Sequence, residues 1–279
     1  MKEIDSVDIT NKVADLCIQA NYCIPVAIIK SFQNAVRIES SEKAKSSLNI
    51  LIENANIAKN ESMAYCQDTG VAVVFVKIGQ DVRIKNGSLE NAINAGVKKG
   101  YEDGFLRKSL ADPLTRKNTG DNTPAVIHYD ILPGEALEIT VAPKGFGSEN
   151  MSQLKMLNPT AGKEGITEFI IKVIKDAGGN PCPPLLVGIG IGGTFEKAAL
   201  ISKKALIRPL GQPNPDNAIA EFEKDLLDKI NATGIGPMGL GGKTTALAVH
   251  IETYPTHIAG LPVAVNLCCH AVRHATATF

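Results

Sequence analysis

The spacing of the apolar residues changes near residue 60, and this change restricts the fold more than any other feature. Before that point apolar side chains recur every three or four positions, as at Ile9 and Val13, which is typical of amphipathic helices. After it come continuous apolar runs such as 71–78 (VAVVFVKI) and 184–193 (PLLVGIGIGG), which read as strands. The sequence therefore predicts a mixed α/β protein, in which a helical N-terminal lobe (residues 1–60) packs on an α/β body with mixed sheets.

The remaining elements follow from the same periodicity and from the turn residues. Helices are expected from Ser88 and over 160–176, 194–206 and 216–230, and strands over 125–131, 136–142, 245–253 and 262–267. The first two of these strands flank Pro133-Gly134, which favours a β-hairpin. A long polar loop at 104–124 and glycine-rich loops at 144–152 and 233–244 connect the elements, and long loops in compact domains often carry function.

Composition and charge exclude several functional classes. Lys plus Arg and Asp plus Glu number 29 each, so no overall field favours nucleic acid or an acidic membrane. The N-terminus carries early acidic residues and lacks the apolar segment of a signal peptide, and no run approaches the ~18 apolar residues of a membrane helix. We therefore expect a cytoplasmic protein with no nucleic-acid or membrane partner, whose six cysteines stay reduced.

The glycine-rich loop 233–244 (TGIGPMGLGGKT) resembles a phosphate-binding P-loop but departs from it in two ways. Pro237 stands where the first glycine of that motif is required. The loop also follows a predicted helix and precedes a predicted strand, whereas a P-loop needs the opposite order so that a helix N-terminus faces the phosphate. We expect this loop to shape the substrate site or to face another subunit, not to bind a nucleotide.

The cysteines fall into two groups. Cys17 and Cys23 lie in the predicted helical lobe, where small buried thiols are the simplest interpretation. Cys66, Cys182 and the pair 268–269 lie instead in loops next to predicted strands. Their wide spacing and the absence of any CxxC motif argue against structural zinc. Dispersed loop cysteines would suit an iron–sulfur cluster, while a set of unrelated core thiols in a metal-free binding module remains the alternative.

Five separated blocks, in order, identify a family resemblance. These blocks read AYCQDTG, KNTGDNTPAVIHYDILPG, KGFGSEN, CPPLLVGIGIGGTFEKAALISKKAL and HIAGLPVAVNLCCHAVRHA. Together they resemble the α subunit of two-subunit class I (iron–sulfur) fumarate hydratases and of L-tartrate dehydratases. The resemblance extends from about residue 5 to the end and implies one catalytic domain over residues 1–279, which includes the helical lobe, with cluster-binding loops that converge at one site.

The resemblance implies a [4Fe-4S] cluster held by three thiolates, those of Cys66, Cys182 and Cys269. Cys268 stands where the family leads us to expect a polar residue, and the spacing from His257 favours Cys269 over it as the ligand. Three protein ligands leave one iron without a protein ligand. An open position of this kind is what a catalytic metal site needs to bind substrate.

The same resemblance assigns the side chains beside the cluster. Gln67 and Asp68, next to a ligand, are expected to line the pocket, with Asp68 bonded to the leaving hydroxyl or passing it a proton. Gly147 resembles a glycine whose backbone approaches the substrate, although Phe146 stands where a further glycine is more frequent. His257 in PTHIAG matches a pocket histidine.

The polar loop 104–124 contributes one further candidate. Arg107 matches an arginine that pairs with a substrate carboxylate, a task suited to its planar fork. Asn118, Asp121 and Asn122 are expected to be structural and to hold the loop over the cluster.

The resemblance also implies a partner. In the family the base, a threonine hydroxyl, and further carboxylate-binding Arg and Lys residues come from a β subunit or a fused domain, so the expected assembly is αβ or (αβ)₂. The expected reaction is the interconversion of (S)-malate with fumarate and water, a step of the tricarboxylic acid cycle, on a small dicarboxylate. L-tartrate or mesaconate as the substrate and a non-catalytic iron–sulfur sensor remain the alternatives.

Overall fold

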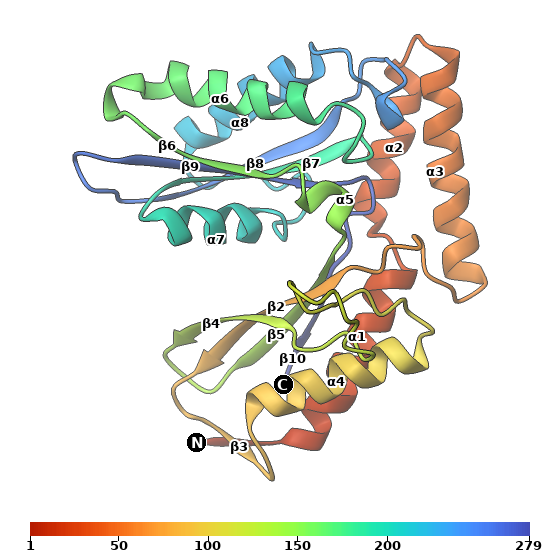
Figure 1. Cartoon of the computed structure of the whole chain (residues 1–279), viewed down its shortest axis with the longest axis vertical. Coiled ribbons are helices and arrows are strands. Elements are labelled where there is room, and N and C mark those ends of the chain that lie inside the picture. The colour runs from red at the N-terminus through yellow and green to blue at the C-terminus, as the bar shows by residue number, and fades with distance from the viewer. The chain divides into compact units, whose positions relative to one another are not determined.

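The structure is a computed structural model that describes residues 1–279, and the chain divides into two compact units (Figure 1). Unit 1 comprises Met1–Ile24, Asn54–Phe146 and Arg273–Phe279, and unit 2 comprises Pro25–Glu53 and Gly147–Val272. The helices are α1 (Ser6–Tyr22), α2 (Val26–Ile38), α3 (Glu42–Asn60), α4 (Leu89–Asp103), α5 (Phe146–Glu149), α6 (Gly162–Ala177), α7 (Phe195–Ala205) and α8 (Asn217–Asn231). The strands are β1 (Lys2–Asp5), β2 (Val71–Gly79), β3 (Val82–Lys85), β4 (Val126–Leu132), β5 (Leu137–Lys144), β6 (Gln153–Leu157), β7 (Leu185–Gly192), β8 (Ala246–Tyr254), β9 (Leu261–Cys268) and β10 (Ala275–Thr278). The mixed α/β class is confirmed.

The helices expected before residue 60 are present as α1, α2 and α3, and they divide between the units. Asp5 caps α1 by accepting a hydrogen bond from the backbone N–H of Val7 at 2.8 Å, and Pro25 precedes α2. The stretch Ser6–Ile38 is long and apolar enough to cross a membrane. It consists of two helices, and 44% of its most apolar window is buried, so it is weak evidence for a membrane span.

Unit 1 contains a four-stranded mixed sheet of order β10-β5-β2-β4. Helices α1 and α4 pack against each other on this sheet (Figure 1), and Gly96 and Gly100 allow their close approach. A Cβ atom at Gly100 would lie 2.7 Å from the carbonyl oxygen of Ala14. The buried side chains of α1, α4, β2 and β5 form the core of this unit.

The predicted hairpin between β4 and β5 is wrong. Strand β2 lies between them, parallel to β4 and antiparallel to β5. The turn at Pro133-Gly134 wraps over the end of β2, where the carbonyl oxygens of Leu132 and Gly134 accept hydrogen bonds from the backbone of 80–81. Because β2 is the more apolar strand and is buried over most of its length, it takes a central position, while the more polar β4 lies at an edge.

Unit 2 has three layers around a second mixed sheet of order β6-β9-β7-β8. Helices α6 and α8 cover one face, and α7 covers the other (Figure 1). The GIGIGG sequence of β7 explains this packing. A Cβ atom at Gly188 would lie 2.2 Å from the carbonyl oxygen of Ser202, and one at Gly190 would lie 2.1 Å from that of Ala198, so α7 rests directly on the strand backbone.

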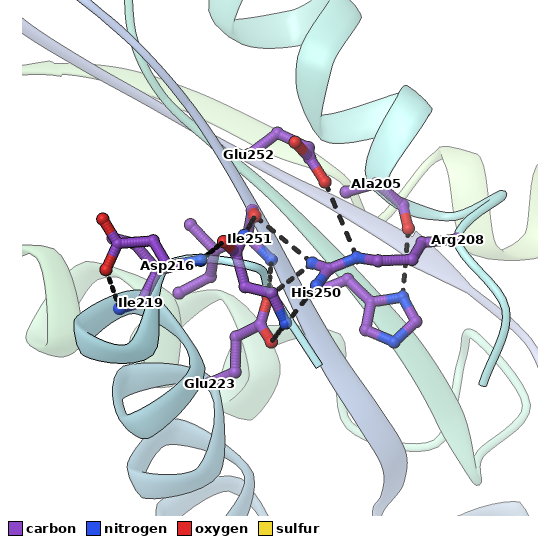
Figure 2. A network of polar contacts seen from close by, with 9 residues as sticks. Ala205, Arg208, Asp216, Ile219, Glu223, His250, Ile251 and Glu252 are labelled. Carbon is purple, nitrogen blue, oxygen red and sulfur yellow. Dashed lines mark hydrogen bonds and ion pairs between the residues drawn. The ribbon is translucent and has the colours of Figure 1, made fainter. Parts of the chain in front are cut away.

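Side chains from the neighbouring segments close the outer edge of β8 (Figure 2). Glu223, on α8, accepts a hydrogen bond from the backbone N–H of Ile251 at 2.6 Å and forms an ion pair with Arg208. The carbonyl oxygen of Ile251 in turn accepts hydrogen bonds from Arg208 at 3.2 Å and from Asn214 at 2.8 Å. These contacts satisfy a stretch of edge backbone that would otherwise be open to pairing with another strand.

Candidate active site

Cys66 lies in unit 1, on the turn that precedes β2. Tyr65, the preceding residue, is held in place by two hydrogen bonds. Its backbone N–H donates to the carbonyl oxygen of Asn21 at 2.9 Å, and its carbonyl oxygen accepts from the side chain of Asn54 at 2.8 Å. Cys66 itself is a partly exposed free thiol, and the neighbouring Gln67 is exposed. The turn is therefore anchored while its thiol stays accessible.

Both carboxylate oxygens of Asp68 accept hydrogen bonds from backbone amides. Oδ1 accepts a hydrogen bond from Gly70 at 3.0 Å, and Oδ2 accepts one from Phe146 at 2.9 Å. A Cβ atom at Gly145 would lie 2.9 Å from Oδ2, so the absence of a side chain there permits this contact. The side chain thus ties the glycine-rich loop 144–152 to the turn of Cys66, and it could pass a proton to a ligand only by giving up one of these bonds.

The polar loop 104–124 is fixed to the same turn. Thr69 donates its hydroxyl to the carbonyl oxygen of Arg107 at 2.8 Å, and the buried Asn122 donates to the carbonyl oxygen of Gly70 at 3.1 Å. Asn122 also accepts from the backbone of 109–110, and Asn118 donates to the carbonyl oxygen of Lys108 at 2.9 Å. These bonds confirm that Asn122 and Asn118 hold the loop, while its position over a cluster stays a prediction.

Asp121 has a similar role, since its Oδ1 accepts hydrogen bonds from the backbone and the hydroxyl of Thr123. These bonds hold the pKa of the Asp121 carboxyl below its usual value. The side chain of Arg107 is exposed and forms no ion pair with a carboxylate of this chain. It is therefore available to an external anion beside the turn of Cys66.

A buried cation that sequence analysis missed lies behind this turn. Arg273 is 4% exposed, and its guanidinium donates from Nη2 to the carbonyl oxygen of Asp68 and from Nη1 to Oδ1 of Asn21 at 3.0 Å. Its Nε is buried and has no hydrogen-bond partner. The sequence signal was an arginine inside the otherwise apolar AVRHA, four residues after Cys269. A buried arginine without a carboxylate partner gives the neighbourhood a positive potential.

Unit 2 brings Cys182 and Cys269 together. The backbone N–H of His270, which follows Cys269, donates to the carbonyl oxygen of Cys182 at 3.2 Å. Cys182 has a φ of +55°, a left-handed conformation that is uncommon outside glycine and that often accompanies a functional role. Both cysteines are partly exposed and form no disulfide, and the same is true of Cys268.

Gly147 is exposed and lies near the same turn of unit 2. The nearest atom to a Cβ built there would be the carbonyl oxygen of Asn180, at 3.8 Å, which is an ordinary contact. Nothing within the chain therefore requires glycine at this position, and the open space is free for a ligand.

His257 is not near Cys182 and Cys269 in its own unit. It lies in the loop between β8 and β9, whereas the two cysteines lie where β7 begins and β9 ends. Strands β7 and β9 are antiparallel and pair from Leu186–Cys268 to Ile191–Val263. The loop of His257 leaves from the far end of this ladder, so the sheet itself separates His257 from the two cysteines.

The loop 233–244 cradles a carboxylate of its own chain. The backbone N–H of Lys243 donates to both carboxylate oxygens of Glu39, at 2.8 and 2.9 Å, and that of Thr244 donates to one of them at 2.7 Å. Glu39 is 4% exposed, and Gly242, beside it, has a φ of +137°. The resemblance to a P-loop thus reflects an anion-binding loop whose anion is a side chain of this protein.

The cysteine thiols differ in their exposure, and the candidate cluster ligands are the more exposed ones. Cys17 is buried in the core of unit 1, and burial raises the pKa of its thiol to about 12, which confirms a packing role. The thiols of Cys66, Cys182 and Cys269 are partly exposed on anchored turns. Within either unit alone, no three His, Cys, Asp or Glu side chains form a ready metal site. The donor set of three accessible soft thiols fits an iron–sulfur cluster, which binds through thiolates.

Comparison with known proteins is consistent with these observations. Residues 10–278 match the family model described as "Fumarate hydratase (Fumerase)". The chain is 45% identical to the putative L(+)-tartrate dehydratase subunit alpha of Methanocaldococcus jannaschii, over 96% of each chain. It is 32% identical to the L(+)-tartrate dehydratase subunit alpha of Escherichia coli K12, over 96% of this chain and 89% of that one.

These matches place the chain in the class of hydro-lyases, which are enzymes that add or remove water. The chain belongs to the fumarate hydratase family.

Proposed function

We propose that this chain is the cluster-bearing α subunit of a [4Fe-4S] hydro-lyase that interconverts (S)-malate with fumarate and water. The observation that carries this proposal is the backbone hydrogen bond from His270 to Cys182, which joins the partly exposed loops of Cys182 and Cys269 in a chain that matches the fumarate hydratase family along nearly its whole length. Residues 1–279 act as one catalytic domain in this proposal, with both units supplying residues.

Cys66, Cys182 and Cys269 would hold the cluster and leave one iron without a protein ligand. When bound, the cluster supplies a Lewis acid for the substrate hydroxyl and an adjacent carboxylate, so that a poor leaving group can depart. A fourth cysteine ligand would close that position. Cys268 is not needed as a ligand in this assignment.

The chain's own side chains then bind and orient the substrate. Arg107 binds a substrate carboxylate, for which its exposed and unpaired guanidinium is suited. The exposed Gln67 donates its amide to a substrate oxygen, and the open space at Gly147 lets the backbone approach the substrate. Asp68 bonds to the leaving hydroxyl or passes it a proton through Oδ2, once the hydrogen bond from Phe146 is released.

His257 is kept as a candidate whose Nε2–H donates to a substrate oxygen, although the sheet of unit 2 separates it from Cys182 and Cys269 of the same chain. Nδ1 accepts a hydrogen bond from the backbone of Ala259 at 3.1 Å, and this contact favours the tautomer that carries the proton on Nε2.

A β subunit completes the enzyme in this proposal and supplies the base and further carboxylate-binding residues. The relatives named above are called alpha subunits, which supports a partner of this kind. The assembly is αβ or (αβ)₂, in the cytoplasm. The purified α chain is therefore expected to carry a cluster but to be inactive alone.

A second candidate substrate has specific support, because the curated relatives are named as L(+)-tartrate dehydratase subunits. The test is to co-express the α and β chains anaerobically and to assay malate, L-tartrate and mesaconate side by side. A kcat/KM for malate at least tenfold above the others supports fumarate hydratase, and the reverse order assigns the chain to tartrate. A loaded complex without hydro-lyase activity on any of the three would favour an iron–sulfur sensor.

A further inference from the structure

The turn that carries Cys182 has almost no backbone donors of its own. Residues 181–184 read PCPP, and because proline has no backbone N–H, only Cys182 can donate a hydrogen bond. That N–H donates to the carbonyl oxygen of Gly179 at 3.0 Å. Any further backbone hydrogen bond to this turn must therefore use its carbonyl oxygens and a donor from another segment of the chain.

Two segments that are distant in the sequence supply such donors. The backbone N–H of His270 donates to the carbonyl oxygen of Cys182 at 3.2 Å, and that of Met238 donates to the carbonyl oxygen of Pro183 at 2.8 Å. Met238 belongs to the glycine-rich loop 233–244. This loop therefore supports the cysteine turn at the residue directly after the thiol.

The same loop packs on the turn with no side chain between the two backbones. Gly239 has a φ of +73°, and a Cβ atom there would lie 2.7 Å from the Cα atom of Gly179. Within the loop, a Cβ atom at Gly236 would lie 2.2 Å from the carbonyl carbon of Gly241. The loop is therefore compact, and a shift of the loop should displace the turn.

The far end of the loop is fixed by Glu39, which follows the last residue of α2. The buried carboxylate of Glu39 accepts hydrogen bonds from the backbone N–H groups of Lys243 and Thr244. A Cβ atom at Gly242 would lie 2.9 Å from Oε2 of Glu39, so this close approach requires glycine. Hydrogen bonds to a carboxylate are stronger than those between neutral groups, which makes Glu39 a firm anchor for the loop.

We propose that Glu39 is a positioning residue for Cys182 and acts through the loop 233–244. The proposal rests on the proposed function, in which the Cys182 thiolate holds the cluster. The contacts form one path within unit 2, from the Glu39 carboxylate to the loop, and from the amide of Met238 to the carbonyl oxygen beside Cys182. Removal of a group that orients a metal ligand typically weakens metal binding by about 10–100-fold.

The first test measures how firmly the full-length chain holds its iron. Glu39→Gln keeps the size of the side chain but replaces one acceptor oxygen with an NH₂ group, which cannot accept a hydrogen bond from the loop. After anaerobic reconstitution with iron and sulfide, a chelator should remove iron from this variant about tenfold faster than from the wild type. Release at the wild-type rate would overturn the proposal.

A matched variant separates positioning from a general loss of stability. Val263→Ala removes two methyl groups from the fully buried core of unit 2, at the end of the β7–β9 pairing that is far from Cys182. Denaturant melts place this variant and Glu39→Gln on one stability scale. Val263→Ala should release iron at the wild-type rate, and equal acceleration in the two variants would refute the positioning role.

The second test uses the chain without iron. Gly239→Ala adds the Cβ atom that would press on Gly179, so it disturbs the contact between loop and turn directly. In Glu39→Gln and in Gly239→Ala, hydrogen exchange should rise at the amides of Cys182 and Met238, above the level seen in Val263→Ala. Exchange at Cys182 that is unchanged in Glu39→Gln would show that the loop does not transmit the loss of its anchor, against the proposal.

Failure of the proposal can be told apart from failure of the function on which it rests. Retention of iron in Cys182→Ser would contradict the proposed ligand role, whatever the behaviour of the Glu39 variant. Iron that is lost from Cys182→Ser but held as firmly in Glu39→Gln as in the wild type would contradict the positioning role alone.

Discussion

Arg273 donates a hydrogen bond from Nη1 to Oδ1 of Asn21 at 3.0 Å, and both side chains are buried. The two residues are 252 positions apart, so this contact joins the C-terminal segment of the chain to its first helix within unit 1. The same guanidinium binds the carbonyl oxygen of Asp68, and the backbone of Asn21 binds Tyr65. The turn of Cys66 therefore has its position set from both sides by this pair.

Arg273→Lys should loosen that turn. Lysine keeps the charge but cannot reproduce the fork that reaches Asn21 and Asp68 together, so the free energy of unfolding should fall by about 1.5–3 kcal/mol. Chemical denaturation of the α chain measures the loss, and hydrogen exchange at residues 66–70 should rise with it. Arg83→Lys is the control, since Arg83 is 67% exposed and pairs with Glu3 at the surface. Equal effects from the two variants would refute the positioning role.

The cysteine assignment predicts a specific pattern of iron content. Anaerobic reconstitution should give about four iron and four sulfide per wild-type chain. Serine at residue 66, 182 or 269 should reduce that content severely, whereas Cys23→Ser and Cys268→Ser should leave it unchanged. Iron content retained in the Cys269 variant and lost in the Cys268 variant would transfer the ligand role to Cys268.

An iron without a protein ligand should also make the enzyme sensitive to oxygen. Exposure of the αβ complex to air should remove its activity, and Fe²⁺ with a thiol should restore it, because the exposed iron is lost before the thiolate-bound ones. Assays before exposure, after exposure and after restoration, with iron analysis at each stage, follow the loss. Activity indifferent to air would contradict an accessible cluster.

Glu39 should be important for the stability of unit 2. Glu39→Ala leaves the amides of Lys243 and Thr244 without their acceptors in a buried site, and the expected loss of stability is about 2–4 kcal/mol. Glu42→Ala is a matched control on the surface, where its partner Lys45 adds little. Denaturant melts of both variants measure the difference, and a loss under about 0.5 kcal/mol for Glu39→Ala would contradict its role.

The buried His250 and the partly buried His274 should make stability decrease in mild acid. Burial lowers the pKa of His250 and of His274, and the nearby Arg208 lowers that of His250 further. The unfolded chain therefore binds more protons than the folded chain below about pH 6.5, and stability falls with pH by up to about 1.4 kcal/mol per pH unit for each histidine. The contribution is complete above about pH 6.5 and is lost as the pH drops toward the lowered pKa values.

Denaturant melts from pH 8 to pH 5 measure this slope. Glu252, whose pKa is raised by burial, opposes the trend as the pH falls through that raised pKa, because the folded chain then binds more protons at this carboxyl than the unfolded chain does. His250→Gln should flatten the slope, because it removes one of the two imidazoles whose pKa is lowered in the folded chain. An unchanged slope in His250→Gln would rule out His250 as its source.

The sequence predicted the class and most elements because the long helices and the central strands carry strong periodicity. The hairpin was mispredicted because Pro133-Gly134 favours a turn but does not say which strands pair, and the burial of β2 decides the pairing. Strands β6 and β10 are short edge strands with little apolar pattern, and their pairing with β9 and β5 defines them. Local sequence carries no such long-range information.

Prediction of the site residues from the sequence has the same limit. Cysteines in recognisable blocks could be assigned as candidates, and the structural asparagines of the polar loop followed from their turn chemistry. The position of Arg273 could not be foreseen, because its partners Asn21 and Asp68 lie more than 200 residues away in the chain. The separation of His257 from Cys182 was equally hidden, since it depends on the antiparallel pairing of β7 with β9.

Helix α7 touches β7 through the bare backbone at Gly188 and Gly190, and Cys182 stands just before that strand. Because no side chain of the strand lies between α7 and β7 at these two positions, a displacement of the helix should displace the strand backbone as well. The position of the Cys182 sulfur therefore depends on the packing of α7 against β7 as well as on the hydrogen bonds of its own loop. A methyl group added at Gly190, far from any ligand, would be expected to disturb metal loading as well as folding.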